Sequence, residues 1–359
     1  MSKPDILSFL NDEFLMPQPE VLEHSTKRES LFIGIPKECA FQEKRVPLVP
    51  EAVALLVSNG HKVYVESNLG LSSSFSDQEY SEAGAKICLN VKEVYEADII
   101  LKVEPPSLEE LDYFKHNQCL ISALQLKTQK AEYFKKLMDK KVTAVAFDYI
   151  KDEAQVFPIV RSMGEIAGTS SILIAAELLS TFSGGRGLLM GGIPGVKPTR
   201  VVIIGAGTVA EYAARSAVGL GALVSVFDNS VARLRRMQSD LNFPIATSIM
   251  QPKVLEKALK RADVAIGALR AKEGRTPCVI SDEMVQKMKP KSVIVDVSID
   301  QGGCFETSEL TTHESPIFTK YDVIHYGVPN IASRVAKTAS FSLSNILAPL
   351  LLKVGEGGG

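Results

Sequence analysis

Histidine and cysteine are scarce in this chain of 359 residues, which has five of each. The cysteines are scattered without C-x-x-C spacing, and His, Cys, Asp and Glu form no cluster with metal-ligand spacing. The sequence therefore predicts neither a disulfide framework nor a metal site. An odd, dispersed set of thiols favours a reducing compartment, so we expect a cytoplasmic protein.

The chain also lacks a block of one charge and an apolar run long enough to span a bilayer. Its 40 basic and 42 acidic residues leave a net charge of −2, so nothing indicates binding to nucleic acid or to an anionic membrane. The longest apolar stretch, 341–354, is too short for a span and contains Pro349. The first residues have no apolar signal-peptide core, so we expect no secretion. The remaining composition is typical of a globular protein long enough for two domains.

A glycine-rich turn near the centre of the chain is the most informative motif. The β-branched run at 200–204 predicts a buried parallel strand, and Gly205, Gly207 and Ala210 follow it at G-x-G-x-x-G/A spacing. The first glycine permits a tight turn, the second lets the backbone approach a pyrophosphate, and the alanine allows close helix packing. The helix expected at 211–221 would favour a phosphate at its start. The pattern predicts a dinucleotide-binding domain.

An acidic residue at the end of the next strand indicates which dinucleotide is bound. Asp228 follows Gly207 by 21 residues, close to the spacing at which a carboxylate accepts hydrogen bonds from the adenosine ribose. A carboxylate there repels a 2′-phosphate, so NAD is the preferred cofactor. Arg233, Arg235 and Arg236 lie a few residues further on and keep NADP open as the alternative.

Strand–helix alternation predicts a second α/β domain at 31–160, which has no glycine fingerprint and is therefore assigned to the substrate. We expect residues 1–30 to be an arm, 161–334 to be the NAD-binding Rossmann domain, and 335–359 to hold a final apolar helix starting at Ala339. The predicted fold class is α/β. The active site is expected in the cleft between the two domains, at the carboxyl ends of the strands.

Several stretches together resemble one family, alanine dehydrogenase and the nucleotide-binding subunit of proton-translocating transhydrogenase. The matching stretches are Ile33-Gly-Ile-Pro-Lys-Glu38 with Glu43-Lys-Arg-Val46, Ile99–Val103 with Pro105, the glycine-rich loop 183–196, and 296–304. The last two are closest to alanine dehydrogenase. The resemblance covers about residues 31–354 and implies that the C-terminal helix returns to the substrate domain.

The resemblance also implies an activity and a set of site residues. Alanine dehydrogenase moves a hydride between the α-carbon of alanine and C4 of NAD through an imine, giving pyruvate and ammonium. Arg45 then corresponds to the residue that grips the substrate carboxylate, and Lys102 to the lysine that polarises the keto oxygen. Asp300 corresponds to the catalytic aspartate, Asn330 to an asparagine near the nicotinamide, and Met163 to a pocket wall. The predicted cofactor contacts are Gly205, Ala206, Gly207, Thr208, Val209, Ala210, Asp228, Gly267, Ala268, Leu269, Val297, Asp300 and Asn330. A homo-oligomer, dimer or hexamer, is also implied.

One position departs from the family. Where alanine dehydrogenases carry a catalytic histidine, this chain has Gln125, which can orient a carbonyl but cannot shuttle a proton at neutral pH. The transhydrogenase subunit typically has an aromatic residue there. Gly164 replaces a serine that reaches the nucleotide, and His325 is the one histidine near the expected site. We therefore predict an alanine dehydrogenase-like enzyme that is slow or altered in substrate. A transhydrogenase subunit and an NAD-binding protein without turnover are the alternatives.

Overall fold

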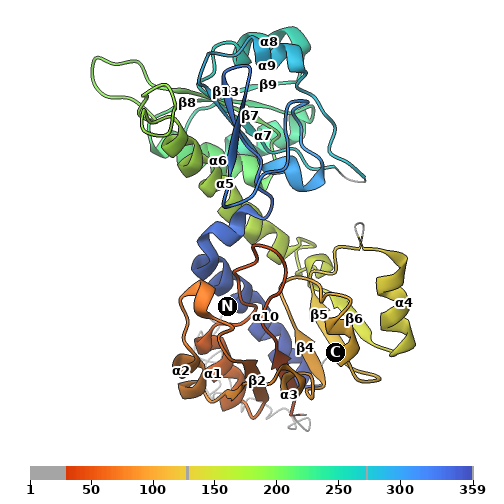
Figure 1. Cartoon of the computed structure of the whole chain (residues 1–359). Helices are drawn as coiled ribbons and strands as arrows, with labels where there is room; N and C mark the ends of the chain where they lie inside the picture. The colour runs from red at the N-terminus through yellow and green to blue at the C-terminus, as the bar shows by residue number, and fades with distance from the viewer. Residues whose placement is uncertain (1–29, 127–128, 272–273, 358–359) are drawn as a thin grey trace, which may run out of the picture.

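The computed structural model describes residues 30–126, 129–271 and 274–357. The predicted arm, apart from residue 30, lies outside the described residues. The described chain forms two lobes, each built on one sheet, and helix α5 (Pro158–Leu178) runs from one lobe to the other (Figure 1). This arrangement confirms the prediction of two α/β units.

The first lobe contains a six-stranded sheet in the order β3-β2-β1-β4-β5-β6, and all its strand pairs are parallel. Its strands are β1 (Phe32–Ile35), β2 (Lys62–Glu66), β3 (Lys86–Cys88), β4 (Ile99–Leu101), β5 (Cys119–Ser122) and β6 (Thr143–Ala146). Its helices and 3-10 turns are α1 (Pro50–Ser58), η3 (Leu71–Ser73), α2 (Asp77–Glu82), α3 (Val91–Val94), η4 (Glu110–Tyr113), α4 (Ala131–Asp139) and η5 (Phe147–Tyr149). Buried apolar side chains fill both faces of this sheet, as a parallel sheet requires.

The second lobe contains a seven-stranded sheet in the order β12-β13-β11-β10-β7-β8-β9, with β12 antiparallel to β13 and the other pairs parallel. Its strands are β7 (Arg200–Ile204), β8 (Leu223–Phe227), β9 (Ala246–Ser248), β10 (Val264–Gly267), β11 (Val293–Asp296), β12 (Ile317–Lys320) and β13 (Val323–Tyr326). Its helices and turns are α6 (Thr208–Gly219), α7 (Val231–Asp240), α8 (Pro252–Leu259), α9 (Asp282–Gln286), η6 (Val297–Gln301) and η7 (Ile331–Val335). The strand order changes direction between the neighbouring strands β7 and β10, and doubly wound folds bind ligands at such a point.

The last helix, α10 (Ala336–Gly355), packs in the core of the first lobe (Figure 1). Leu343, Leu347 and Leu351 recur every four residues, so they share one face of the helix and enter the same buried cluster as Ile33. Together with η7, this segment is long and apolar enough to cross a membrane by length and composition alone, but 44% of that window is buried inside the protein. Its packing is that of a core helix.

Helix α10 also fixes the loop that precedes α1. The backbone N–H groups of Val46 and Val49 donate to the hydroxyls of Ser340 and Ser344, at 2.9 and 2.8 Å. All four residues are buried, so these bonds form away from competing water. The end of the chain therefore positions the loop that carries Arg45.

Helix α5 lies close against α6. A Cβ atom on Gly168 would lie 2.3 Å from the carbonyl oxygen of Val209, so a larger side chain would push the two helices apart. One turn earlier, a Cβ on Gly164 would stand 3.6 Å from Thr208, an ordinary contact distance. This close packing brings the first half of α5 to the start of α6, where the glycine-rich turn ends.

Candidate functional site

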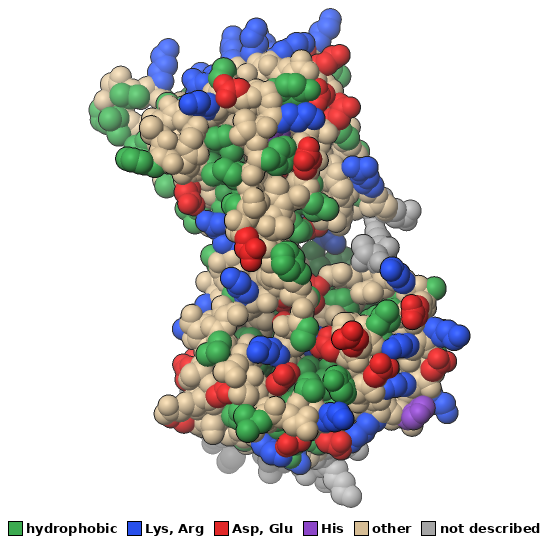
Figure 2. Space-filling view, in the orientation of Figure 1, with side chains coloured by type: hydrophobic (Ala, Val, Ile, Leu, Met, Phe, Trp, Pro, Cys, Tyr) green, Lys and Arg blue, Asp and Glu red, His purple; other side chains and the backbone are tan. Residues whose placement is uncertain are grey.

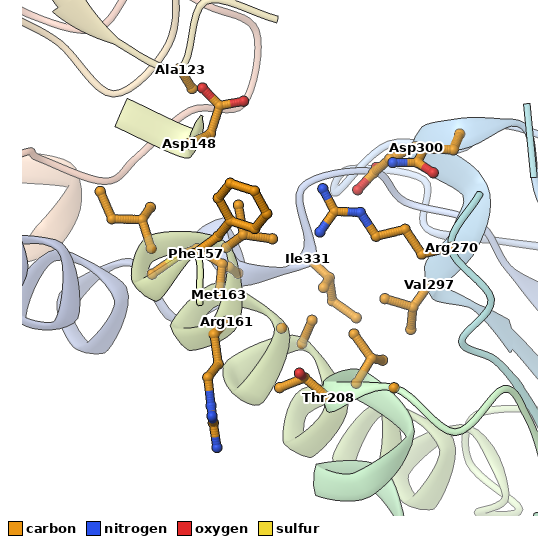
Figure 3. Close-up of a pocket in the computed structure, with 18 of the residues that line it drawn as sticks. Ala123, Asp148, Phe157, Arg161, Met163, Thr208, Arg270, Val297, Asp300 and Ile331 are labelled. Atoms are coloured by element: carbon orange, nitrogen blue, oxygen red, sulfur yellow. The ribbon is translucent and has the colours of Figure 1, made fainter. Parts of the chain in front are cut away.

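A cavity of about 910 Å³ lies between the two lobes. Val103 and Ala123, just beyond strands β4 and β5, line it from the first lobe, and residues just beyond β7, β10 and β11 line it from the second. The carboxyl ends of both parallel sheets therefore face one space, as predicted. Figure 2 shows the molecule narrowed between its lobes. Figure 3 looks into the cavity, with Met163 on α5, Thr208 at the start of α6, and Asp300 in the second lobe.

The glycine turn has the geometry of a dinucleotide loop. Gly205 has a φ of +115°, and a Cβ there would lie 2.5 Å from the carbonyl oxygen of Ala268, so only glycine fits. Gly207 has no atom within 4 Å of where its Cβ would be, which leaves the backbone open for close approach by a ligand. Thr208 then begins α6, whose free N–H groups favour an anion.

The predicted cofactor residues divide into two groups. Those that line the cavity are Gly207, Thr208, Val209, Ala268, Leu269, Val297, Asp300 and Asn330. Those that stand behind it are Gly205, Ala206, Ala210, Asp228 and Gly267. The second group shapes the turn, because Ala210 is fully buried and Gly267 is hydrogen-bonded within the sheet.

Asp228 is tied to the glycine turn. One carboxylate oxygen accepts the N–H of Ala206 at 2.8 Å, and the other accepts the N–H of Ser230 at 2.7 Å. The guanidinium of Arg233 approaches the first oxygen at 3.7 Å, and Arg233 also lines the cavity. The acid and the nearest of the three predicted arginines thus lie together beside the turn. Turn, open backbone and acid fit an adenine dinucleotide.

Arg45 lies at the first-lobe side of the cavity and is paired with Glu43. Its Nε and Nη2 atoms donate to the two Glu43 oxygens at 2.8 and 2.6 Å, a two-pronged carboxylate contact. Nη2 also lies 3.4 Å from Glu104, and Nη1 lies 3.3 Å from the sulfur of Met163. Burial alone would lower the pKa of Arg45, but the Glu43 hydrogen bond and charge raise it. The guanidinium stays charged.

Asn330 links this pair to the second lobe. Its side-chain N–H donates to Glu43 at 2.7 Å, and its backbone N–H donates to Asp300 at 3.2 Å. Burial raises the pKa of Asp300, which the N–H of Asn330 and the charge of Arg45 only partly offset. Arg45, Met163, Asp300 and Asn330 all line the cavity, so four predicted substrate-site residues converge there.

Gln125 lies beside Glu104, a residue that the sequence reasoning missed, and neither of them is among the residues that line the cavity. Its side-chain amide donates to a carboxylate oxygen of Glu104, whose other oxygen faces Arg45. Burial raises the pKa of Glu104 to about 7 against the opposing charge of Arg45, and the charges of Glu43 and Asp300 raise it further. Glu104 follows the predicted Lys102 by two residues, where an extended chain would place it on the same side, and that spacing was the available signal.

The structure does not bring Lys102 to the cavity. Its ammonium group is 1% exposed and lies 2.7 Å from Glu110, 3.1 Å from the carbonyl of Lys37 and 3.6 Å from Glu38. Burial would lower the pKa of Lys102, but the two glutamates raise it. The lysine is enclosed one layer behind Val103, which does line the cavity.

His325 is also enclosed. Its ring nitrogens lie 2.8 Å from the hydroxyl of Thr307 and 2.9 Å from the carbonyl of Val323, and the ring stacks on Phe318. Burial lowers the pKa of His325, which keeps the ring neutral. It does not line the cavity and does not replace the histidine missing at Gln125. Among residues 30–126, 129–271 and 274–357, no group of three or more His, Cys, Asp or Glu side chains could hold a metal ion.

Sequence comparison places both halves of the chain in one family. Residues 34–167 match the N-terminal domain, and residues 171–359 the C-terminal domain, of the family described as alanine dehydrogenase/PNT. An alanine dehydrogenase of Methanococcus maripaludis is 40% identical over 330 residues, covering 91% of this chain and 88% of the relative. An alanine dehydrogenase of Bacillus subtilis is 40% identical over 329 residues, covering 91% and 86%.

Solved structures agree with this relationship. An L-alanine dehydrogenase superposes with a TM-score of 0.86 at 38% identity, covering 91% of this chain and 90% of the other. A transhydrogenase from Sinorhizobium meliloti superposes with a TM-score of 0.80 at 26% identity, covering 90% and 94%. Sequence identity and TM-score are both higher for the alanine dehydrogenase. The chain belongs to the alanine dehydrogenase/PNT family, on its alanine dehydrogenase side.

Proposed function

We propose that this protein is an NAD-dependent amino-acid dehydrogenase that converts L-alanine, NAD⁺ and water to pyruvate, NADH, ammonium and a proton. The observation that carries the proposal is the convergence of Arg45, Met163, Asp300 and Asn330 with the glycine turn on one cavity. The names of the relatives, at 40% identity over 91% of the chain, support the same reaction. The domain limits proposed are 31–160 for substrate and 161–334 for cofactor, with 335–359 returning to the first.

Arg45 binds the substrate carboxylate in this proposal. Glu43 holds two of its nitrogens, so the guanidinium is oriented before substrate arrives. Among the residues that the structure describes, Nη1 meets only the sulfur of Met163 within hydrogen-bonding distance, so it is the nitrogen available to a carboxylate. A planar, always-charged donor in a buried site suits an anionic substrate. Met163 and Leu343 supply the apolar wall for a methyl side chain.

NAD, when bound, accepts a hydride from the substrate α-carbon or returns it. Asp300 and Asn330 lie where η6 and the loop after β13 meet the cavity, on the cofactor side of Arg45. A carboxylate beside the reacting carbon stabilises the cationic imine. We assign that role to Asp300, with Asn330 fixing its position through the backbone N–H.

Lys102 does not contact the substrate in this proposal and acts through neighbouring residues. Its ammonium balances Glu38 and Glu110, and Glu38 in turn accepts the N–H of Val103 at 2.6 Å. The lysine thus fixes the backbone at the end of β4, where the chain enters the cavity wall. We propose a positioning role for Lys102 in place of direct polarisation of the keto oxygen.

NAD(H) is the proposed cofactor, with Asp228 as the residue that disfavours NADPH. The carboxylate is held by two backbone N–H groups, so it cannot swing away from a 2′-phosphate. The positive charge of Arg233, 3.7 Å from Asp228, favours a 2′-phosphate and so opposes this preference for NADH. Calorimetric titration with NADH and NADPH tests this: the native protein should prefer NADH, and Asp228→Ser should narrow the difference. Equal affinities in the native protein would contradict the assignment.

A transhydrogenase-like role is the second candidate, because the transhydrogenase structure overlaps at a TM-score of 0.80. It predicts nucleotide exchange only with a membrane partner and no reaction with a 2-oxo acid. We also propose a cytoplasmic homo-oligomer. Exposed apolar side chains on the loop after α5 support association with another copy; they are Phe182, Leu189, Ile193 and Val196.

An NADH-oxidation assay decides between the candidates. The purified protein is supplied with NADH, ammonium and either pyruvate or another 2-oxo acid. We expect turnover, lost in Arg45→Ala and kept in the control Arg215→Lys, whose arginine pairs with Glu211 on the surface of α6. Tight NADH binding without oxidation in the presence of any 2-oxo acid would contradict the dehydrogenase and leave the nucleotide-binding alternatives.

A further inference from the structure

Two carboxylates share one guanidinium at the edge of the cavity. Arg45 Nη2 lies 2.6 Å from Glu43 and 3.4 Å from Glu104. Glu43 keeps its charge, because the hydrogen bonds and charge of Arg45 lower its pKa despite burial. The Glu104 side chain is only 15% exposed, so water screens its charge poorly. The arginine is already neutralised before any substrate carboxylate arrives.

The other charged groups around Glu104 do not relieve this excess of negative charge. Asp300, from η6 of the second lobe, adds a further negative charge that acts on Glu104. Glu38 accepts the backbone N–H of Glu104 at 3.3 Å, and its own charge is balanced by Lys102 at 3.6 Å. Arg45 is the cation that contacts the Glu104 carboxylate among the described residues.

A 2-oxo acid bound at Arg45 therefore brings a third carboxylate to one guanidinium, beside Glu43 and Glu104. At an effective dielectric near 20, two like charges about 4 Å apart repel by about 4 kcal/mol, so the site avoids holding all three ionised. The group best placed to give up its charge is Glu104, because Glu43 has both oxygens on the guanidinium and Glu104 has one distant contact. Protonation of Glu104 frees the Nη2 edge for the substrate.

We propose that Glu104 takes up a proton when the 2-oxo acid binds at Arg45 and then serves as the general acid of the reaction, replacing the histidine that is absent at Gln125. This inference rests on the proposed dehydrogenase function. The side-chain amide of Gln125 donates to one Glu104 oxygen and so fixes that oxygen as an acceptor. The proton then resides on the other oxygen, the one that faces Arg45 and the bound acid.

The proposed step balances without a further reactant. Ammonia attacks the carbonyl carbon, a C–N bond forms, and the C=O π pair moves to oxygen, which takes the proton of Glu104. The Glu104 carboxylate then removes a proton from the new ammonium group. It returns that proton to the hydroxyl, which leaves as water while the nitrogen lone pair forms the imine. The products are a cationic imine, water and ionised Glu104, and the hydride then reduces the imine carbon.

Proton uptake on binding is the first test. Oxamate, an unreactive analogue of pyruvate, is titrated by calorimetry into the NADH-saturated protein at pH 8, in buffers of different ionisation enthalpy. The native protein should take up about one proton per oxamate, and Glu104→Gln close to none, since its amide is neutral. Binding to the native protein should weaken about tenfold per pH unit above pH 7 and be flat in the variant. Binding without proton uptake overturns the proposal.

Turnover is the second test. Glu104→Gln should lower kcat for reductive amination by about a hundred- to ten-thousand-fold, the usual contribution of a general acid. Its KM for the 2-oxo acid at pH 8 should fall, because a competing anion has gone. Glu104→Asp should recover part of kcat. The exposed neighbour Glu109 supplies the matched control, Glu109→Gln, which should match the native enzyme.

The possible results separate this inference from the proposed function. If the native enzyme turns over and Glu104→Gln keeps native kcat, Glu104 is not the acid while the dehydrogenase stands. If none of the 2-oxo acids tested causes the native enzyme to oxidise NADH, the proposed function fails. In that case, proton uptake on oxamate binding would still test whether Glu104 is protonated when an anion binds at Arg45. Oxamate binding without proton uptake would overturn this part of the proposal as well. Far-ultraviolet circular dichroism spectra of both Glu104 variants that match the native spectrum confirm that folding is intact.

Discussion

Two buried cations in the first lobe, Lys102 and Arg45, each lie between two glutamates, yet they face different surroundings. Lys102 is 1% exposed and is enclosed by Glu38, Glu110 and the carbonyl of Lys37. The contacts that its ammonium makes with the described residues all lie within the first lobe. A lysine in that position supports structure.

Arg45 is nearly as buried, at 8% exposure, but it lines the cavity between the lobes. Within the described part of the chain, its Nη1 atom meets only a thioether at hydrogen-bonding distance, and a thioether is a weak acceptor. One of its two glutamates is held at 3.4 Å and can yield to another anion. The comparison teaches that a buried cation becomes a binding group when its contacts are incomplete on the side that faces a cavity.

The largest effect is expected from breaking the enclosed cluster, which consists of Lys102, Glu38 and Glu110. Lys102→Met leaves Glu38 and Glu110 buried without a cation, which typically costs about 3–5 kcal/mol of unfolding free energy. The loss should shrink as the pH falls, because Glu38, whose pKa burial raises to about 7, can then be protonated. Urea unfolding at pH 8 and pH 5.5 measures it.

An exposed pair provides the control for this variant. Lys287 forms an ion pair with Glu256 at 2.7 Å, with both side chains on the surface. Lys287→Met should leave the urea midpoint unchanged, because exposed pairs contribute little. Comparable losses in the two variants would show that burial is not the source of the Lys102 effect.

Arg45→Lys tests the open cluster, which consists of Arg45, Glu43 and Glu104. A lysine keeps the positive charge but cannot hold both Glu43 oxygens and offer a further donor to substrate. We expect kcat/KM for the 2-oxo acid to fall about 100-fold, equal to about 2.7 kcal/mol. NADH affinity should be unchanged, because Arg45 contacts none of the glycine turn. A fall in NADH affinity of similar size would mean that the two sites are not separate.

The difference between the clusters also shows what sequence reasoning can reach. The glycine turn was predictable because the requirements of Gly205 and Gly207 are local to the chain. The lobes were predictable because strand–helix alternation repeats. Short, weakly patterned elements such as β3, β9 and β12 were not assigned, since three or four residues carry little periodic signal.

The site residues were predictable only in part. Arg45 and Asp300 were identified by resemblance, and both line the cavity. Alternation in an extended chain puts Lys102 and Glu104 on one side and does not tell which of them contacts Arg45. Glu38 and Glu110, from other segments, enclose Lys102, whereas Glu104 lies beside Arg45. Contacts between distant segments decide it, and a single sequence does not contain them.

The third prediction sharpens the comparison through pH. Because the folded protein raises the pKa of Glu104 from 4.5 to about 7, folded Glu104 binds its proton more tightly than the unfolded chain does. Stability should therefore rise as the pH falls from 8 towards 4.5. Glu104→Gln should remove about 3 kcal/mol of that rise, measured by urea unfolding across this range. Burial also raises the pKa of Glu38 to about 7, so Glu38 still contributes to the rise in unfolding free energy in the variant.

Gln125→His is expected to give the smallest change, and it reverses the departure at the open cluster. The backbone at Gln125 has a φ of +48°, a conformation that histidine tolerates better than most residues. A ring N–H would still donate to Glu104, and the ring would add a second group that exchanges protons near neutral pH.

We expect kcat/KM for alanine to rise about three- to tenfold in Gln125→His, because Glu104 already supplies a proton and the new ring only shortens its path to solvent. Steady-state kinetics of native enzyme, Gln125→His, Glu104→Gln and the double variant measure this. If Glu104 is the acid, histidine should help little in its presence and much more in the Glu104→Gln background. Equal gains in both backgrounds would mean that the two groups act independently and that Gln125 does not serve Glu104.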